Sequence, residues 1–166
     1  MSEELEVYKK AIANLFDSGS DLPVSNSKPD HAVALYELFF DRAREEVIIF
    51  CNKLKKEVFN NEAVTKSLEC ALDRGIKIRV LLQCDSAQVE CTRLSNFQTH
   101  DNFLPKYAST EDANSRLNFC VVDKKAFRYE SDKNTFEAVA VMNNPKVSEK
   151  LYKSFEEMWG RVDSVN

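Results

Sequence analysis

The segment between residues 47 and 82 constrains the fold more than any other part of the chain. Residues 47–51 form a compact run of β-branched and aromatic side chains, which is typical of a buried strand. Residues 61–74 have apolar side chains at helical spacing, Gly75 suits the end of that helix, and residues 76–82 are again apolar. Strand, helix, glycine and strand in this order predict a βαβ unit with parallel strands and a right-handed crossover.

The rest of the sequence extends this unit into one α/β domain. Residues 1–28 are expected to form an N-terminal helix at 3–17 and a polar connector at 18–28, and residues 29–166 form the domain proper, within a single compact domain overall. Further elements are expected as a helix from 29 to about 44, a polar loop at 52–56, a helix at 86–98, an irregular stretch at 99–115, strands at 117–122, 125–130 and 136–142, and a helix at 145–162. We therefore expect a mixed, mostly parallel sheet with helices on both faces.

Composition narrows the classes of function. The chain is 43% hydrophobic and 30% charged, as in ordinary globular proteins, and its net charge of −4 argues against broad, non-specific DNA binding. A small local phosphate pocket is still compatible with this charge. No apolar run reaches the ~20 residues of a membrane span, and no secretory signal is visible. The five cysteines contain no CxxC pair, so we expect reduced thiols, a cytoplasmic location, and neither a metal nor a cofactor.

The most specific motif begins at Arg116. One residue separates Arg116 from Asn118, four residues separate Asn118 from Asp123, and six separate Asp123 from Glu130-Ser131. Two further residues separate Ser131 from Asn134. This frame resembles the signature of the phospholipase D superfamily, which is His-x-Lys, four residues, Asp, six residues, Gly-Ser, two residues and Asn. Two weaker matches accompany it, at residues 43–50 and 71–82. The resemblance covers roughly residues 33–160 and implies one phospholipase D-like half-domain.

The resemblance also implies a loss of chemistry. In the family, two His-x-Lys motifs meet, one histidine attacks phosphorus, and the lysine and asparagine hold phosphate oxygens. Here Arg116 stands at the position of the histidine and Asn118 at that of the lysine. A guanidinium stays protonated and has no lone pair to attack phosphorus, so no residue is assigned a catalytic role. Family half-proteins pair through their motifs, which implies a homodimer.

Two interpretations of the changed site are open. In the first, Arg116, Asn118, Ser131 and Asn134 form a phosphate-binding pocket without turnover, rimmed by Lys53 and Lys55 from the loop after the first strand. In the second, Arg116 pairs with Asp123, Glu130 or Glu137 and the old pocket is closed. Glu130 favours closure because it adds a carboxylate where a phosphate would bind. Asp123 is expected to be structural, in a hairpin turn with Lys124.

Two further features have ordinary explanations. His100 lies next to Asp101 and is either a general base or, more in keeping with the lack of a nucleophile, a solvated loop residue. The apolar stripe of the last helix, which contains Phe155, Met158 and Trp159, either packs on the sheet or forms a dimer face.

The sequence therefore predicts a catalytically inactive phospholipase D-like module with a binding or regulatory role. It would act as a homodimer and recognise a phosphate-containing ligand or a nucleic-acid end. One alternative is an active phosphodiesterase or nuclease that uses non-standard residues or a partner chain. The other is a protein–protein adaptor whose pocket is vestigial.

Overall fold

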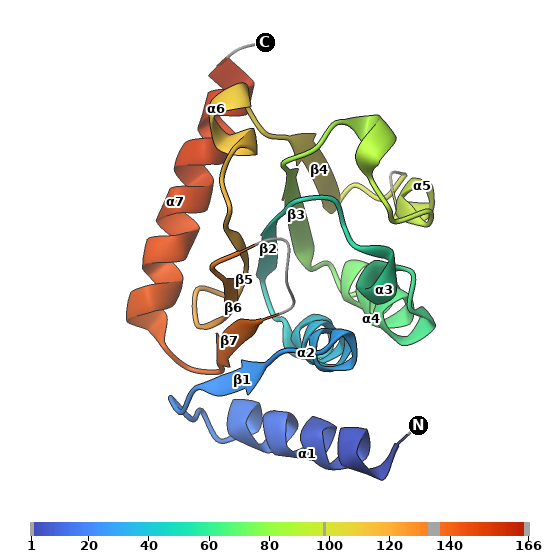
Figure 1. The fold of residues 1–166 in the computed structure, drawn as a ribbon, viewed down its shortest axis with the longest axis vertical. Coiled ribbons are helices and arrows are strands. Elements are labelled where there is room, and N and C mark those ends of the chain that lie inside the picture. Colours follow the sequence, from blue (N-terminus) through green and yellow to red (C-terminus); the bar gives the residue numbers. More distant parts are fainter. Residues whose placement is uncertain (1, 98, 133–136, 165–166) are drawn as a thin grey trace.

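The computed structural model describes residues 2–97, 99–132 and 137–164. Among these residues, seven strands form one sheet in the order β1-β7-β6-β5-β2-β3-β4 (Figure 1). The strands are β1 (Val24–Asn26), β2 (Glu46–Cys51), β3 (Lys77–Leu82), β4 (Phe103–Tyr107), β5 (Asn118–Val122), β6 (Ala126–Glu130) and β7 (Ala138–Val141). The pairs β2–β3 and β3–β4 are parallel, and the other four pairs are antiparallel.

Helices cover both faces of this sheet. The helices are α1 (Glu3–Asp17), α2 (Pro29–Arg42), α3 (Lys56–Phe59), α4 (Glu62–Asp73), α5 (Leu94–Phe97), α6 (Thr110–Ala113) and α7 (Pro145–Ser164), with a 3-10 turn at Ser86–Gln88. Residues of α2 and α4 form one apolar core with alternate residues of β2, β3 and β5, and α7 forms a second core on the opposite face. Helix α1 packs outside α2 (Figure 1), so that side has two helical layers.

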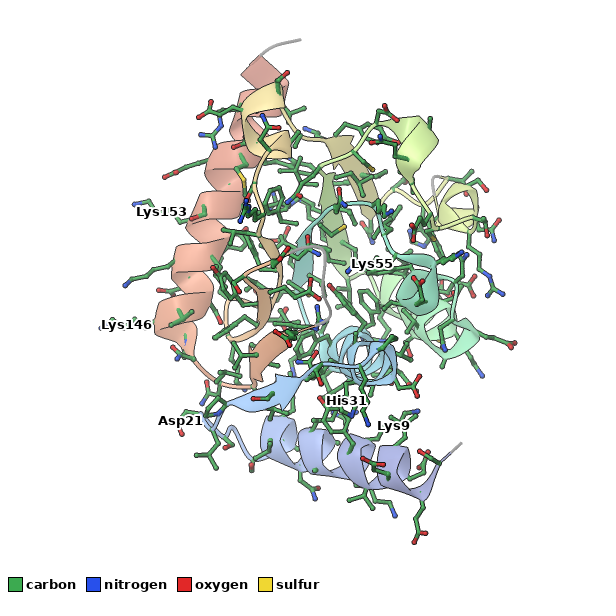
Figure 2. The ribbon with its side chains drawn as sticks, in the orientation of Figure 1. Lys9, Asp21, His31, Lys55, Lys146 and Lys153 are labelled. Atoms are coloured by element: carbon green, nitrogen blue, oxygen red, sulfur yellow. The ribbon has the colours of Figure 1, made fainter. Side chains whose placement is uncertain are left out.

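The βαβ unit and the final helix follow the sequence prediction. Strands β2 and β3 are parallel and joined through α4, and Gly75 ends that helix with a φ of 87°, a conformation that favours glycine. In α7, Phe155 is fully buried and Met158 is nearly so, which confirms packing on the sheet. The surface of this helix carries lysines such as Lys146 and Lys153, which project away from the sheet (Figure 2).

Five parts of the prediction need correction. The sheet is mixed as expected, but it is mostly antiparallel, because the chain reverses between β5 and β6 and because β5 also runs antiparallel to β2. The connector at 18–28 contains β1, which pairs with β7. The stretch at 99–115 contains β4 and α6, and the loop at 52–56 leads directly into α3. Residues 86–98, expected to be one helix, form only the 3-10 turn and α5 in the described part.

Helix α1 docks on α2 through an aromatic pair. The ring of Tyr8 stacks on His31 at 4.2 Å between centroids, in the gap between the two helices where Figure 2 labels His31. Ile12 is buried one turn further along α1. Burial raises the pKa of Tyr8 to about 12, although the positive charge of Arg128 acts in the opposite direction. The N-terminal helix therefore lies close to the polar cluster described next.

Candidate functional site

Two of the motif residues, Asn118 and Glu130, lie where three neighbouring strands end together. Asn118 is the first residue of β5 and pairs in register with Glu130, the last residue of β6. On the other side of β5, the antiparallel strand β2 ends at Cys51 and continues into Asn52. The sheet thus brings these residues to the carboxyl end of β2, the edge where open α/β sheets bind ligands.

Asn118 and Glu130 are bonded to each other rather than open to a ligand. The Asn118 Nδ2 donates to Glu130 Oε2 at 2.9 Å, and the backbone N–H of Asn52 donates to Asn118 Oδ1 at 3.1 Å. Both side chains are buried, with Glu130 only 2% exposed. The amide of Asn118 is therefore held at both ends, and its donor is used by a carboxylate of the same chain.

Arg128 supplies the positive charge for this cluster. It lies two residues before Glu130 on β6, and its Nη2 is 2.7 Å from Glu130 Oε1, with both side chains almost inaccessible to solvent. Its Nε and Nη2 also donate to Asn26 Oδ1 at 3.3 and 3.1 Å, and its guanidinium lies 5.8 Å from the ring centroid of Tyr36. A buried ion pair is tolerated only when such additional hydrogen bonds compensate for the lost water.

A small cavity adjoins the cluster. Its volume is about 20 Å³, room for roughly one water molecule and too small for a phosphate group. The lining comes from α2, the loop after β2, α3 and the ends of β5 and β6, and includes Tyr36, Cys51, Lys53, Lys55, Asn118, Arg128 and Glu130. The site is therefore closed in this structure, as the second interpretation of the sequence expects.

The closure does not involve Arg116. This residue is exposed, two positions before Asn118, and makes no hydrogen bond or ion pair within the described residues. Pairing of Arg116 with Glu130 or Asp123 was a wrong prediction, because Glu130 is bound by Arg128 and the Asp123 carboxylate is occupied by backbone N–H groups. Pairing with Glu137 is likewise not found. Arg116 is therefore an exposed cation just before β5, without a partner among the described residues.

The remaining ligand candidates differ in their surroundings. Lys53 Nζ lies 2.7 Å from Glu90 Oε1, and this hydrogen bond raises the pKa of Lys53. Lys55 precedes α3 and lines the cavity (Figure 2). Ser131 is exposed directly after β6. Asn134 lies outside the described residues.

Asp123 lies at the opposite end of the sheet from this cluster. Its carboxylate accepts hydrogen bonds, each of 2.9 Å, from the backbone N–H groups of Arg44, Glu45 and Glu46, where the chain enters β2. Asp123 and Lys124 both have positive φ, at 52° and 54°, in the turn between β5 and β6. The geometry is that of a structural residue which joins the β5–β6 turn to the start of β2.

The thiols near the cluster are not activated. Cys51 and Cys120 are both buried on the side of the sheet that faces α2. Burial raises the pKa of the Cys51 thiol to about 12 and raises that of Cys120 as well. Because the thiolate is the nucleophilic form, neither thiol is suited to attack phosphorus at neutral pH.

Within the described ranges, no three His, Cys, Asp or Glu side chains are grouped so that they could hold a metal ion. In the same ranges, no helix is both long and apolar enough to cross a membrane.

The sequence interpretation missed Arg128 and Asn26, the two residues that complete the cluster. Arg128 had a signal, because alternation along 126–130 places Ala126, Arg128 and Glu130 on one face of a strand with apolar neighbours. Two opposite charges in adjacent positions of that face suggest a buried pair. Asn26 had no such signal in the sequence, because its strand has only three residues and lies in a polar stretch.

Solved structures of known proteins share this fold. NucT from Helicobacter pylori superimposes with a TM-score of 0.64 at 13% identity, covering 84% of this chain and 96% of that one. Nuc from Salmonella typhimurium, a phospholipase D family member, superimposes with a TM-score of 0.63 at 16% identity, covering 84% of this chain and 95% of Nuc. TrmBL2, an archaeal chromatin protein, superimposes with a TM-score of 0.63 at 16% identity. The superposition covers 96% of this chain but only 64% of TrmBL2.

The protein is therefore an α/β domain with a phospholipase D-like fold. No curated protein matches it in sequence. A family model does match, over residues 28–165, and the chain belongs to that family, DUF7931, a domain of unknown function. The match begins after β1, so both α1 and the strand that supplies Asn26 precede the family region.

Proposed function

We propose that this protein is a catalytically inactive phospholipase D-like module that binds a phosphate-containing ligand. The observation that carries the proposal is the hydrogen bond between Asn118 and Glu130. The side chain at the motif's second position is bound to a carboxylate of the same chain, and the first position holds an arginine that cannot act as a nucleophile. Both observations argue against phosphodiester cleavage, and the support for binding comes from the exposed cation described next.

The free cation supports a ligand with phosphate groups. Arg116 is exposed and unpaired within the described residues, and arginine binds phosphate through two parallel hydrogen bonds. Lys53 and Lys55 contribute positive charge to the same edge of the sheet, although Glu90 neutralises Lys53 in part. Ser131 and Asn134 complete the proposed ligand set from the segment after β6. A terminal phosphate of a small molecule or of a nucleic acid fits such a local site better than a long duplex does.

The proposal is tested by thermal unfolding of wild type and Arg116→Ala with inorganic phosphate and short oligonucleotides. A ligand that binds only the folded state raises the melting temperature, so we expect a rise in wild type that is lost in Arg116→Ala. Arg44→Ala is the matched control, because Arg44 is also exposed but lies at the opposite end of the sheet. Equal shifts in all three proteins would contradict the proposal.

Turnover separates this proposal from its alternatives. We expect no hydrolysis of a generic phosphodiester reporter such as bis(p-nitrophenyl) phosphate. A hydrolysis rate proportional to the concentration of purified protein would support an active phosphodiesterase instead. The absence of both hydrolysis and any ligand-induced shift would leave a protein–protein adaptor as the better account.

We also propose a homodimer as the working state. The large apolar side chains that are exposed in the described residues lie on separate elements, namely Val7, Leu22 and Tyr107. An interface would therefore be largely polar, and its affinity modest. Sedimentation over a range of concentrations tests this, and a monomer throughout would contradict it.

A further inference from the structure

The buried guanidinium of Arg128 requires an anion beside it. This side chain is 3% exposed, and an arginine cannot escape burial by losing its proton. An isolated charge in such a place is strongly unfavourable unless an opposite charge and hydrogen bonds compensate. In the structure Glu130 supplies that charge, from the same strand.

The groups around the Glu130 carboxylate are held in place by other parts of the protein. Asn118 is fixed because its Oδ1 accepts from the backbone of Asn52. Arg128 is fixed by Asn26 on one side and by the ring of Tyr36 beneath it. The donors that face Glu130 therefore form a preorganised anion site, and Glu130 is the one member that could be exchanged.

The position of Glu130 makes such an exchange physically simple. It is the last residue of β6, and the chain after it is an exposed bend at Ser131. Turning this side chain outward would leave the rest of β6 paired with β5. The cavity beside it, of about 20 Å³, admits no phosphate while the carboxylate is inside. Lys53 and Lys55 line the same cavity.

We propose that Glu130 is an internal occupant of an anion site whose cation is Arg128, and that a terminal phosphate binds there by displacing the Glu130 carboxylate. This inference rests on the proposed function and assigns the main binding charge to Arg128, which lines the cavity, and not to Arg116. The ligand class follows from charge. A phosphodiester carries one negative charge, as the carboxylate does, whereas a terminal phosphate carries about 1.5 to 2 at neutral pH. Only the terminal phosphate gains Coulomb energy from the exchange.

The first experiment compares Glu130→Gly with Glu130→Gln. Glycine removes as many non-hydrogen atoms as inorganic phosphate contains, so this variant should bind inorganic phosphate about tenfold more tightly than wild type, or ~1.4 kcal/mol. Glutamine keeps the side-chain volume and should show no such gain. Sodium chloride at equal ionic strength is the control for salt effects. A folded Glu130→Gly that binds phosphate no better than wild type would overturn the inference.

Stability gives a second readout, because Glu130→Gly leaves Arg128 without its anion. We expect a lowered melting temperature that saturating phosphate restores, even if the variant is unfolded in plain buffer. The double variant Arg128→Gln/Glu130→Gly should show no restoration. Equal restoration in both variants, or none in Glu130→Gly, would mean that Glu130 is only a structural partner of Arg128.

The ligand class is tested on wild type with one oligonucleotide, with and without a 5′-phosphate. We expect tighter binding of the phosphorylated form, and equal binding would overturn the assignment to a terminal phosphate. The failures of the two proposals are distinguishable. Phosphate binding that depends on Arg116 but is unchanged in Glu130→Gly would contradict this inference and leave the proposed function standing. No binding by wild type would contradict the proposed function and the displacement of Glu130, and a gain in Glu130→Gly would then show only that Arg128 forms an anion site that Glu130 keeps closed.

Discussion

Asn118 and Glu130 lie directly opposite each other on β5 and β6, and the side-chain amide of the first donates to the carboxylate of the second at 2.9 Å. Twelve residues apart in sequence, they close the site that the phospholipase D-like frame would otherwise leave open. The pair also connects to Asn52 and Arg128, so the polar cluster links three adjacent strands. Its members are therefore expected to contribute to stability as well as to binding.

Asn118→Ala should lower the free energy of unfolding by about 1–3 kcal/mol, the usual cost of leaving buried polar groups unpaired. It removes the acceptor of the Asn52 N–H and one donor to Glu130. Urea denaturation followed by circular dichroism measures the effect. Asn96→Ala is the control, because Asn96 is exposed on α5 and its side chain makes no hydrogen bond within the described residues. An equal loss of unfolding free energy in Asn118→Ala and Asn96→Ala would contradict a stabilising role of the cluster.

Asn26→Ala tests the contribution of the N-terminal strand. The change removes the acceptor of two Arg128 donors and the bond from Asn26 Nδ2 to the carbonyl of Ala138. We expect a loss of about 1–3 kcal/mol in denaturant unfolding, because hydrogen bonds to a charged group are among the stronger ones. Ser25→Ala, on the exposed side of the same strand, should be close to neutral. If both variants match wild type, β1 does not brace Arg128.

Asp123→Ala should destabilise the fold without altering any binding at the cluster. Its carboxylate satisfies three backbone N–H groups at the entry to β2, and alanine leaves them to water, at a cost of about 1–3 kcal/mol. Chemical denaturation gives the stability, and phosphate titration gives the binding. The exposed Asp101 serves as the control through Asp101→Ala. A loss of phosphate affinity in a stable Asp123→Ala would show that Asp123 belongs to the site after all.

Stability at acid pH should depend on Asp112. Its carboxylate is bonded to Arg161 at 2.7 and 2.9 Å, and these bonds, opposed by burial and assisted by Ser109, hold the pKa of Asp112 below its usual value. Since the unfolded pKa is about 3.9, this stabilisation is present above that pH and is lost as the pH falls through the lower folded pKa. Asp112→Asn should therefore be less stable than wild type at neutral pH, with a smaller further loss below about pH 4.

Thermal unfolding at a series of pH values measures this dependence. Asp101→Asn should leave the wild-type profile unchanged, because Asp101 is exposed. An Asp112→Asn profile parallel to that of wild type would contradict the role given to the Arg161 pair.

The thiols give a simple check of burial. Cys70 is exposed on α4, whereas Cys51, Cys84, Cys91 and Cys120 are buried. In the native protein we expect one of the five thiols to react rapidly with 5,5′-dithiobis(2-nitrobenzoate), and all five in guanidinium chloride. Cys70→Ser should abolish the rapid phase. Rapid reaction of a second thiol in native protein would contradict the packing around the sheet.

Much of the fold was predictable because side-chain periodicity reports burial directly. The nearly continuous apolar run at 117–122 marks a strand that is buried on both faces, and the helical spacing of α7 marks the side of that helix that meets the core. The motif frame likewise located Asn118 and Glu130 on one site. Strand β4 was missed because it lies at the edge of the sheet, includes Pro105 and is only partly buried, so its pattern is weak.

The sequence by itself determined the βαβ unit, the two hairpin strands, the final helix and the loss of the nucleophile at Arg116. Only the tertiary structure decided which groups close the site. Pairing of β1 with β7 depends on backbone hydrogen bonds between segments more than a hundred residues apart, and backbone groups are the same in every residue. The choice of Arg128 over Arg116 as the partner of Glu130 has a similar cause. Both arginines are near in sequence, but alternation along β6 buries Arg128 beside Asn26, whereas Arg116 lies before β5 and is exposed to solvent.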